Sequence, residues 1–366
     1  MLLLNNDDIA RVLTMPLCLE SLEAMFHEIA KGDAVGMGRM DLYVPSGEPA
    51  PYYRWAMMAG GSKKEQFACV RMISDMVSWP VEHGQRRENK YAREPGTYCG
   101  FLLLFSTKDA TPVAMMNDGI LQHQRVGAGA GIGVKYLARE DSHTVGMIGS
   151  GGMARSYLEA FCEVRQITKV KVYSPNPDHV HQYAKEMSGK HCIEVEPASS
   201  AREAVRGVDI AALCASAIEP VFFKEWVEPG MHVVDVTRAS TEADFIHVVD
   251  VAVRPGEATP YIEKLPTTAF YARGGYLAYV AGQPEEQKLI PRISPTVEIL
   301  NMPTLTDLLS GRVPGRTNRK QKTWFLNVGA VGEQFAAVTA AIYKKALQEG
   351  LGTEIPTDWF LESVRA

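Results

Sequence analysis

The spacing of apolar and polar residues divides the chain into distinct segments. Residues 16–31 repeat apolar side chains every three or four positions and precede a glycine, which predicts an amphipathic helix. Residues 36–116 contain short runs of aromatic and branched residues between turn residues, which predicts several antiparallel strands. From residue 144 to about residue 253 strand and helix patterns alternate, and residues 329–348 are helical again. Such an alternation indicates βαβ units and a parallel sheet.

A second helix is predicted between the strand region and the alternating region. Asp118 is a candidate N-cap for this helix, which ends near Ala138. Four glycines lie inside it, and each costs about 1 kcal/mol relative to alanine in a helix interior: Gly127, Gly129, Gly131 and Gly133. We expect close packing against another backbone to compensate for them.

Length and charge narrow the class of protein. The chain has 366 residues, and because domains most often contain about 100–200 residues, we expect two domains. The 38 basic and 43 acidic residues give a net charge of −5, which gives no reason to expect nucleic acid or a membrane as partner. One basic stretch, residues 311–322, is predicted to be a solvated connector.

The N-terminal sequence, the apolar runs and the cysteines predict where in the cell the protein is located. The N-terminal MLLLNNDD lacks the basic start and apolar core of a signal peptide, and no apolar run approaches the roughly 18–20 residues of a membrane span. The six cysteines are scattered without a C-x-x-C motif, which favours reduced thiols and a cytoplasmic protein. The nine histidines show no metal-ligand spacing, so no metal site is expected.

The turn that opens the alternating region carries the motif Gly149-x-Gly151-x-x-Ala154. It follows an apolar strand and opens a helix, which is the context of a dinucleotide-binding turn. The first glycine permits the tight turn, the second lets the backbone approach a pyrophosphate, and the helix N-terminus binds the phosphates. The alternative is a glycine-rich turn without a ligand. The candidate cofactor-binding residues here are Gly149, Ser150, Gly151, Gly152, Met153 and Ala154.

The ends of two later strands add to this site. NAD-binding units place an acidic residue about 20 residues after the turn, where it binds the ribose 2′-OH. Here the second strand ends at Ser174 without an acid, and Ser174 and Asn176 are neutral donors that suit a 2′-phosphate, which favours NADP over NAD. The fourth strand ends at Ala215 and Ser216, which we expect on the nicotinamide side; the alternative for Ser216 is a turn hydroxyl.

Four stretches resemble the ornithine cyclodeaminase/mu-crystallin family: TPVAMMNDGILQHQRVGAGAGIGVKYLARED, VGMIGSGGMAR, VDIAALCASAIEPVF and GAVGEQFAAVTAAIYKKALQEGLGTEIP. The most specific feature is Asp118 followed seven residues later by Arg125, ahead of a helix of small residues. The resemblance covers nearly the whole chain and implies an α/β fold. It implies a Rossmann dinucleotide-binding domain over residues 129–319 and a discontinuous α+β substrate and dimerisation domain from residues 1–128 and 320–366, in a homodimer.

The resemblance also implies hydride transfer at an α-amino or α-imino carbon, with the substrate carboxylate held by arginines and a lysine. The matching positions in this sequence are Arg54, Arg71 and Arg125. Arginine suits this task because it is permanently charged and grips a carboxylate with two parallel hydrogen bonds. For each of the three, the alternative is a structural ion pair.

Two departures from the family concern proton transfer. Arg71 stands where the family has a lysine, and arginine cannot usefully exchange a proton. The catalytic aspartate of the cyclodeaminases is missing after the fifth Rossmann strand, unless Asp235 or Glu242 replaces it. Asp75 lies four residues after Arg71 on the same strand face, so these two are the candidate catalytic residues. His123 is a further candidate.

These features predict an oxidoreductase that uses NADP or NAD and acts on the C–N bond of a small amino or imino acid. The reaction would be that of an imine or ketimine reductase or an amino-acid dehydrogenase, with NADP the favoured cofactor. One alternative is an ornithine-type cyclodeaminase, in which bound NAD is reduced and reoxidised in every cycle. The other is a cofactor-binding protein with little catalysis, like mu-crystallin.

Overall fold

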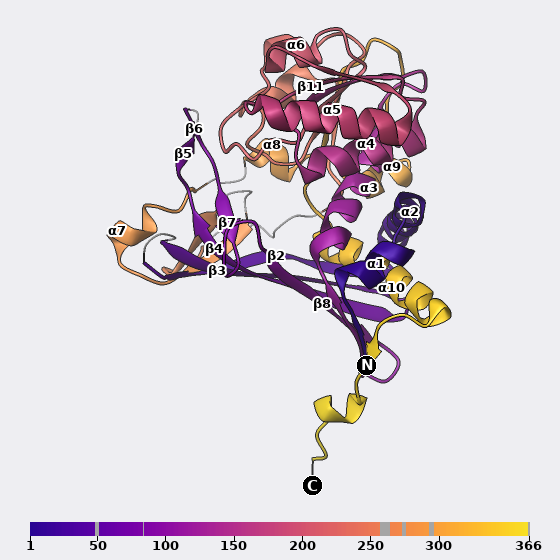
Figure 1. Cartoon of the computed structure of the whole chain (residues 1–366), viewed down its shortest axis with the longest axis vertical. Helices are drawn as coiled ribbons and strands as arrows, with labels where there is room; N and C mark the ends of the chain where they lie inside the picture. The colour runs from indigo at the N-terminus through magenta and orange to yellow at the C-terminus, as the bar shows by residue number, and fades with distance from the viewer. Residues whose placement is uncertain (48–50, 83, 257–263, 273–275, 293–295, 365–366) are drawn as a thin grey trace.

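Two β-sheets organise the chain, and each belongs to its own domain (Figure 1). The computed structural model describes residues 1–47, 51–82, 84–256, 264–272, 276–292 and 296–364. One sheet has ten strands and carries helices on one side, while the other has seven strands and forms the upper domain of Figure 1.

The ten-stranded sheet contains the strands predicted between residues 36 and 116. The predicted runs at 52–58, 67–73 and 98–105 lie in three neighbouring antiparallel strands, which confirms that prediction. The order is β16 (Ala269–Ala272), β17 (Tyr276–Val280), β2 (Ala34–Pro45), β3 (Tyr52–Ser62), β4 (Phe67–Ser78), β8 (Cys99–Ser106), β9 (Pro112–Asn117), β1 (Leu2–Leu4) and β19 (Thr353–Glu354), with β7 (Asn89–Tyr91) paired to β4.

Helices cover one face of this sheet. Figure 1 shows α1 (Asn6–Val12), α2 (Met15–Lys31), α3 (Gly119–Leu137) and α10 (Val331–Glu349) on the same side. The amphipathic pattern of residues 16–31 is confirmed by α2, which begins after the N-cap Thr14 and ends at Gly32 in the left-handed conformation. The strands are amphipathic as well, because alternate positions of β3 are buried under these helices.

The seven-stranded sheet is parallel throughout, as the strand–helix alternation predicts. Its order is β12 (Glu194–Pro197), β11 (Lys169–Tyr173), β10 (Thr144–Ile148), β13 (Ile210–Leu213), β14 (His232–Asp235), β18 (Thr323–Leu326) and β15 (Val251–Val253). The connecting helices are α4 (Gly152–Val164), α5 (Pro177–His191) and α6 (Ala201–Val205). This is the doubly wound arrangement of a Rossmann domain.

Shorter elements complete the chain. The hairpin β5 (Val81–Glu82) and β6 (Gln85–Arg86) rises from the large sheet toward the Rossmann domain in Figure 1. The remaining elements are α7 (Pro284–Gln287), α8 (Val297–Leu300), α9 (Leu305–Leu309) and the 3-10 turns Lys224–Trp226, Phe245–Val248 and Thr357–Phe360.

The helix α3 joins the two domains through its glycines. A Cβ at Gly127 would lie 2.5 Å from the backbone oxygen of Ser156 in α4, and one at Gly133 would lie 2.3 Å from the ring of Phe325 in β18. The expected close approach to another backbone is therefore confirmed at Gly127. Asp118 occupies the N-cap position, but its side chain makes no capping hydrogen bond. The predicted capping role is wrong because Arg71 holds this carboxylate with two hydrogen bonds.

The sheets divide the chain differently from the predicted boundaries at residues 128 and 319. β16 and β17 fall inside the range assigned to the Rossmann domain, yet β17 pairs with β2 of the large sheet. β18 falls outside that range, yet it lies between β14 and β15. Both exceptions are strands of four or five residues, which are too short for periodicity to assign to a sheet.

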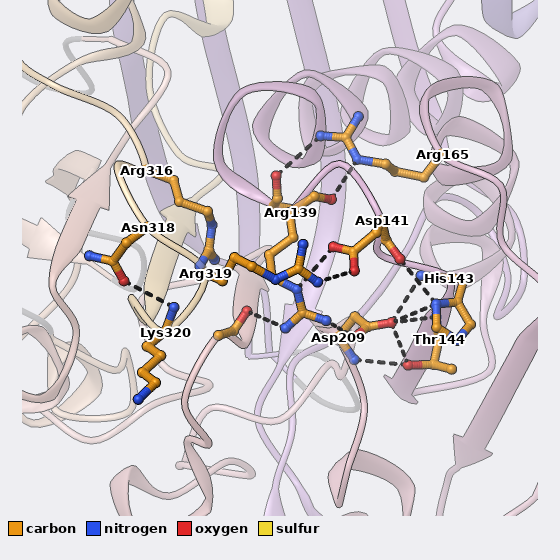
Figure 2. A network of polar contacts seen from close by, with 12 residues as sticks. Arg139, Asp141, His143, Thr144, Arg165, Asp209, Arg316, Asn318, Arg319 and Lys320 are labelled. Atoms are coloured by element: carbon orange, nitrogen blue, oxygen red, sulfur yellow. Dashed lines mark hydrogen bonds and ion pairs between the residues drawn. The ribbon is translucent and has the colours of Figure 1, made fainter.

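The basic stretch 311–322 is a connector, and it is fastened to the amino-terminal edge of the Rossmann sheet (Figure 2). Arg316 donates hydrogen bonds to the carbonyl oxygens of Leu137 and Gln321 and to the hydroxyl of Thr323. Arg319 forms an ion pair with Asp141. The prediction of a solvated connector is confirmed, since most of these residues are exposed, while Arg316 also satisfies a carbonyl group at the end of α3.

The described part of the chain contains neither a helix suited to cross a membrane nor a cluster suited to hold a metal. None of its helices combines the length and the apolar character that crossing a membrane requires. Within the same residues, no group of three or more His, Cys, Asp or Glu side chains is placed to hold a metal ion.

Candidate active site

The glycine-rich turn between β10 and α4 has the geometry of a phosphate-binding turn. Gly149 has φ +110°, and a Cβ there would lie 2.7 Å from the carbonyl oxygen of Cys214, so both its conformation and its surroundings require glycine. Gly151 is the N-cap of the thirteen-residue α4, and a Cβ there would meet nothing within 4 Å. The free N–H groups of the helix therefore face open space, which fits a pyrophosphate.

The other residues of the turn have different roles. Ser150 is buried beside the turn, while a Cβ at Gly152 would lie 2.7 Å from Nε2 of His123 in α3. Ala154 is fully buried, and its carbonyl oxygen accepts a hydrogen bond from the hydroxyl of Tyr183 in α5. It thus serves helix packing, as the motif requires.

A cavity of about 640 Å³ lies over this turn at the carboxyl ends of β10, β11 and β13. Its walls include Gly149, Ser150, Gly151, Ser174, Ala215 and Ser216, all predicted cofactor-binding residues. None of the described residues that line it is acidic, whereas Arg87 and Arg202 are basic. Volume, position and charge therefore fit a dinucleotide, whose phosphates are anionic.

Asn176 does not line this cavity. Its side-chain oxygen accepts hydrogen bonds from the backbone N–H groups of Asp178 (3.0 Å) and His179 (3.3 Å), and so it caps α5. The predicted contact with a cofactor is replaced by this cap. Ser174 does line the cavity, and Arg202 of α6 supplies the arginine that the sequence lacks at the turn itself.

A second cavity of about 290 Å³ adjoins the first, and the two share Cys214, Ala215 and Ser216. It lies between the Rossmann domain and the large sheet. Its other walls are Arg39, Arg54, Glu88, Lys90, Gln122, Met153, Val236, Thr237, Arg238, Tyr276 and Val328. Met153, predicted to touch the cofactor, is therefore placed on the substrate side of the turn.

Two arginines of this second cavity are neutralised by acids of the protein. Arg54, a predicted substrate-binding residue, forms a buried ion pair with Asp75 and lies 3.4 Å from Glu88. Arg39 pairs with Asp41 at 2.6 Å and lies over the ring of Tyr276, 4.7 Å from its centre. Both guanidinium groups are thus fixed in the wall and can present their remaining donors to a ligand.

Arg71 and Arg125, the other two predicted carboxylate-binding residues, do not line the cavity. Arg71 is held by Asp118, and both arginines lie over the same buried ring, Phe335, at 4.6 and 4.4 Å from its centre. Arg125 donates to Gln122, at 2.9 Å from Nη2, and Gln122 does line the cavity. Burial, together with repulsion from Arg71, lowers the pKa of Arg125 to about 9.

The candidate proton donors also lie away from the cavity walls. Asp75 is buried in its ion pair with Arg54, and Asp235 is fully buried at the end of β14. Glu242 accepts a hydrogen bond from the backbone N–H of Lys224, and His123 packs on Gly152. The described cavity lining therefore contains no aspartate of the kind that the cyclodeaminase alternative requires.

Several cationic side chains of the cavity have unused hydrogen-bond donors, and Nε of Arg54 is one of them. Nε and Nη1 of Arg238 are buried and have no hydrogen-bond partner in the described structure. Burial lowers the pKa of Arg238, and nearby Arg254 lowers it further. Lys90 of β7 is exposed in the open cleft, and the described residues provide it with no hydrogen bond or ion pair. For the buried nitrogens of Arg238 an unpaired state is costly, so a ligand is expected to complete them.

The sequence patterns do not identify Arg39, Lys90, Arg202 and Arg238 as site residues. Each is a single basic residue in a strand, turn or short helix, without a motif around it. Arg238 lies in the stretch after the fifth Rossmann strand, where parallel sheets bind ligands, and that position is the only signal that could have found it.

The comparisons with known proteins agree with this geometry. The family model of the ornithine cyclodeaminase/mu-crystallin family matches residues 81–350. A Δ1-pyrroline-2-carboxylate reductase of Bacillus cereus is 27% identical over 71% of this chain and 74% of its own length. The ketimine reductase mu-crystallin of Rattus norvegicus is 30% identical over 36% of this chain and 41% of its length.

A solved structure resembles the whole chain. The Δ1-pyrroline-2-carboxylate reductase of Thermococcus litoralis, in complex with NADH and L-proline, has a TM-score of 0.76 and 27% identity, covering 97% of this chain and 100% of its own. The predicted fold class and the predicted enzyme class, a nicotinamide-dependent oxidoreductase of C–N bonds, are confirmed. The chain belongs to the ornithine cyclodeaminase/mu-crystallin family.

Proposed function

We propose that this protein reduces the C=N bond of a small cyclic imino acid with a nicotinamide dinucleotide. The observation that carries the proposal is the junction of the two cavities at Cys214, Ala215 and Ser216. A dinucleotide that extends from the glycine-rich turn to this junction has its nicotinamide at the entrance of the smaller cavity. The smaller cavity, about 290 Å³, suits a ligand of a few heavy atoms.

The arginines of the smaller cavity favour a ligand that carries a carboxylate. Arg39 and Arg54 are already paired with acids, although Nε of Arg54 has no partner in the described structure. Arg238 has two buried nitrogens without a partner, so it offers a carboxylate two free donors. A two-point grip fixes the orientation of a small acid, and orientation supplies much of the rate in a reaction between two bound partners. When bound, the reduced nicotinamide supplies the hydride. The residues of the chain bind the carboxylate, exclude water and direct the imine carbon toward the cavity junction.

Turnover with cyclic imines tests this proposal. The purified protein is mixed with NADPH or NADH and with five- and six-membered 2-carboxylated cyclic imines, and absorbance at 340 nm is followed. We expect one dinucleotide oxidised for each cyclic amino acid formed. Ammonia release from ornithine or lysine without net cofactor change would instead support the cyclodeaminase, and bound cofactor without any turnover would support a binding protein.

We also propose that NADP is the preferred cofactor. The end of β11 offers Ser174, and the described lining of the cavity combines Arg87 and Arg202 with no acid. A carboxylate would repel a 2′-phosphate, whereas arginine binds phosphate with two hydrogen bonds. The ratio of kcat/KM for NADPH and NADH measures the preference, and a ratio below one would reject it.

A homodimer is the third part of the proposal, with a second copy on the outer face of the large sheet. Most of the alternate residues of β3, β4 and β8 that point away from the helices are apolar, and Ser74, bonded to the Tyr53 hydroxyl, is a polar exception. The apolar ones include Tyr53, Trp55, Met57, Val70, Met72, Phe101 and Leu103. Leu42 and Val44 of β2 extend this face and are 40% and 39% exposed. A continuous apolar face of this kind marks an interface.

Sedimentation measures the oligomeric state directly. We expect a mass of twice 40.3 kDa for the native chain. Met72→Glu places a charge in the middle of the face and should produce monomers that retain their circular dichroism spectrum. A monomeric native chain, or a dimer unaffected by this substitution, would contradict the assignment of this face.

A further inference from the structure

Reduction of an imine needs a proton as well as a hydride, and the predicted proton donors do not reach the cavity. Asp75 lies behind Arg54 in an ion pair, and Arg71 is held by Asp118. The donor must come from a group that lines the cavity and that exchanges a proton near neutral pH. The need for this donor rests on the proposed imine reduction.

Most of the lining groups fail this requirement. Arg39, Arg54 and Arg238 retain their protons under all ordinary conditions. Glu88 lies 3.4 Å from Arg54, an arrangement that favours its ionised, acceptor-only form. The hydroxyls of Ser216 and Thr237 do not ionise in this range.

Lys90 is placed differently. It is the middle residue of β7, which pairs antiparallel with the end of β4 through Val77 opposite Lys90. Its side chain lines the smaller cavity, yet no described residue holds it in a hydrogen bond or an ion pair. The ammonium is therefore free to point into the cavity, toward the position of a bound imine.

The surroundings of Lys90 favour loss of its proton. Desolvation within the cleft lowers its pKa, and Arg54 and Arg39 lower it further, while Glu88 and Asp75 oppose them. Because Lys90 is exposed to solvent, water in the open cleft limits the decrease of its pKa. The positive charge of Lys90 also acts on His123 in α3, where it contributes to the lowered pKa of His123. Tyr276, Arg238 and the thiol of Cys214 complete the charged or titratable groups of the cavity.

We propose that Lys90 is the proton donor of the imine reduction. Its ammonium gives one proton to the imine nitrogen, and the imine carbon accepts the hydride, with its two electrons, from the reduced dinucleotide. The C=N double bond becomes a single bond in a secondary amine, and the dinucleotide leaves oxidised. The neutral amine of Lys90 then takes a proton from water, which restores the starting state.

Three variants test this role: Lys90→Met, Lys90→Arg and the control Lys63→Met. Lys63 is also a strand-end lysine, but its side chain is 78% exposed and pairs with Asp33 outside both cavities. We expect kcat to fall about 100-fold or more in both Lys90 variants, which is within the usual contribution of a general acid. The Lys63 variant should match the native protein, and NADPH fluorescence titration should give the same dissociation constant in all four proteins.

Two further readouts separate proton donation from a mere positive charge. Added ethylamine should restore part of the kcat of Lys90→Met and none of that of Lys90→Arg, whose side chain still fills the site. In the native protein, kcat for reduction should decline as pH rises through the pKa of Lys90, and this decline should disappear in Lys90→Met.

The proposal is overturned if Lys90→Arg retains native kcat, or if Lys90→Met stays within a few-fold of it. If the native protein oxidises no dinucleotide with any cyclic imine, the proposed function itself has failed. A folded Lys90→Met that binds NADPH but shows no amine rescue would also count against proton donation by this residue.

Discussion

The two edges of the Rossmann sheet use arginine in opposite ways. At the amino-terminal edge, Arg139, Arg165 and Arg316 donate from Nε, Nη1 and Nη2 alike. Figure 2 shows contacts of Arg139 and Arg165 at this edge. At the carboxyl-terminal edge, Arg238 has two buried nitrogens without a hydrogen bond in the described structure. Since buried donors are nearly always satisfied, the first set holds the fold together and the second residue is kept for a ligand.

Two buried acids on neighbouring strands show the same contrast. Asp209, before β13, is desolvated, but hydrogen bonds from His143 and Thr144 and the charge of Arg139 lower its pKa. Asp235, at the end of β14, has an oxygen without a partner in the described structure, and burial raises its pKa to about 7. The amino-terminal edge thus stabilises its charges, while the carboxyl-terminal edge tolerates groups that are poorly satisfied, a common property of functional sites.

The largest expected effect concerns Asp235. In the unfolded chain this carboxyl ionises above about pH 3.9, whereas in the folded protein it keeps its proton until about pH 7. Stability therefore falls as pH rises from 4 to 7, by about 4 kcal/mol in total, and stays reduced above pH 7. Asp235→Asn should remove this decline. Urea unfolding at pH 5 and pH 8 measures it, and equal pH dependence in both proteins would contradict the assignment.

The substitution Arg238→Met should have the second-largest effect. Because the guanidinium holds the substrate carboxylate, we expect kcat/KM for the imino acid to fall about 100-fold, or about 2.7 kcal/mol. The free energy of unfolding should stay the same or rise, since the arginine has unpaired buried donors. Loss of stability with unchanged kcat/KM would place Arg238 among the structural arginines.

Arg139→Met should give the reverse pattern. It removes an ion pair with Asp209 in which the two side chains are 19% and 11% exposed. We expect a loss of about 2 kcal/mol in the free energy of unfolding, below the range for fully buried pairs because Asp209 keeps its bonds to His143 and Thr144. Steady-state kinetics at 25 °C should show an unchanged kcat/KM, and a large kinetic defect would break the contrast between the edges.

The smallest effect belongs to Arg202. Its replacement by alanine should lower the preference for NADPH over NADH about tenfold, or about 1.4 kcal/mol, because one phosphate contact at the exposed end of the cavity is lost. The ratio of kcat/KM for the two cofactors measures it. An equal loss with NADH would show that Arg202 serves something other than the 2′-phosphate.

Much of the fold was predictable because its signals are local. The glycines at 149 and 151 and the small residues of α3 carry their meaning in the sequence, and the structure gives a steric reason for Gly149 and Gly127. The ends of β11 and β13 were also predictable, since parallel strands bring Ser174 and Ser216 to one edge. Short strands such as β18 were not, because four residues carry no period.

The arginines of the site were harder to predict for a physical reason. Whether an arginine binds a substrate or an internal acid depends on what lies opposite it, and for Arg71 that acid, Asp118, is 47 residues away. The same holds for Arg54 and Asp75, which meet only when β3 pairs with β4. An unused donor is likewise invisible in a sequence, so Arg238 and Lys90 emerge only from the structure.

Calorimetric titration of a cyclic amino acid tests the central claim most directly. L-proline is titrated into the native protein, Arg238→Met and Arg139→Met, each loaded with oxidised dinucleotide so that no reduction occurs. If unused donors mark the substrate site, the native protein and Arg139→Met bind with the same affinity and Arg238→Met binds about 100-fold more weakly. Equal binding by Arg238→Met and the native protein would contradict the account.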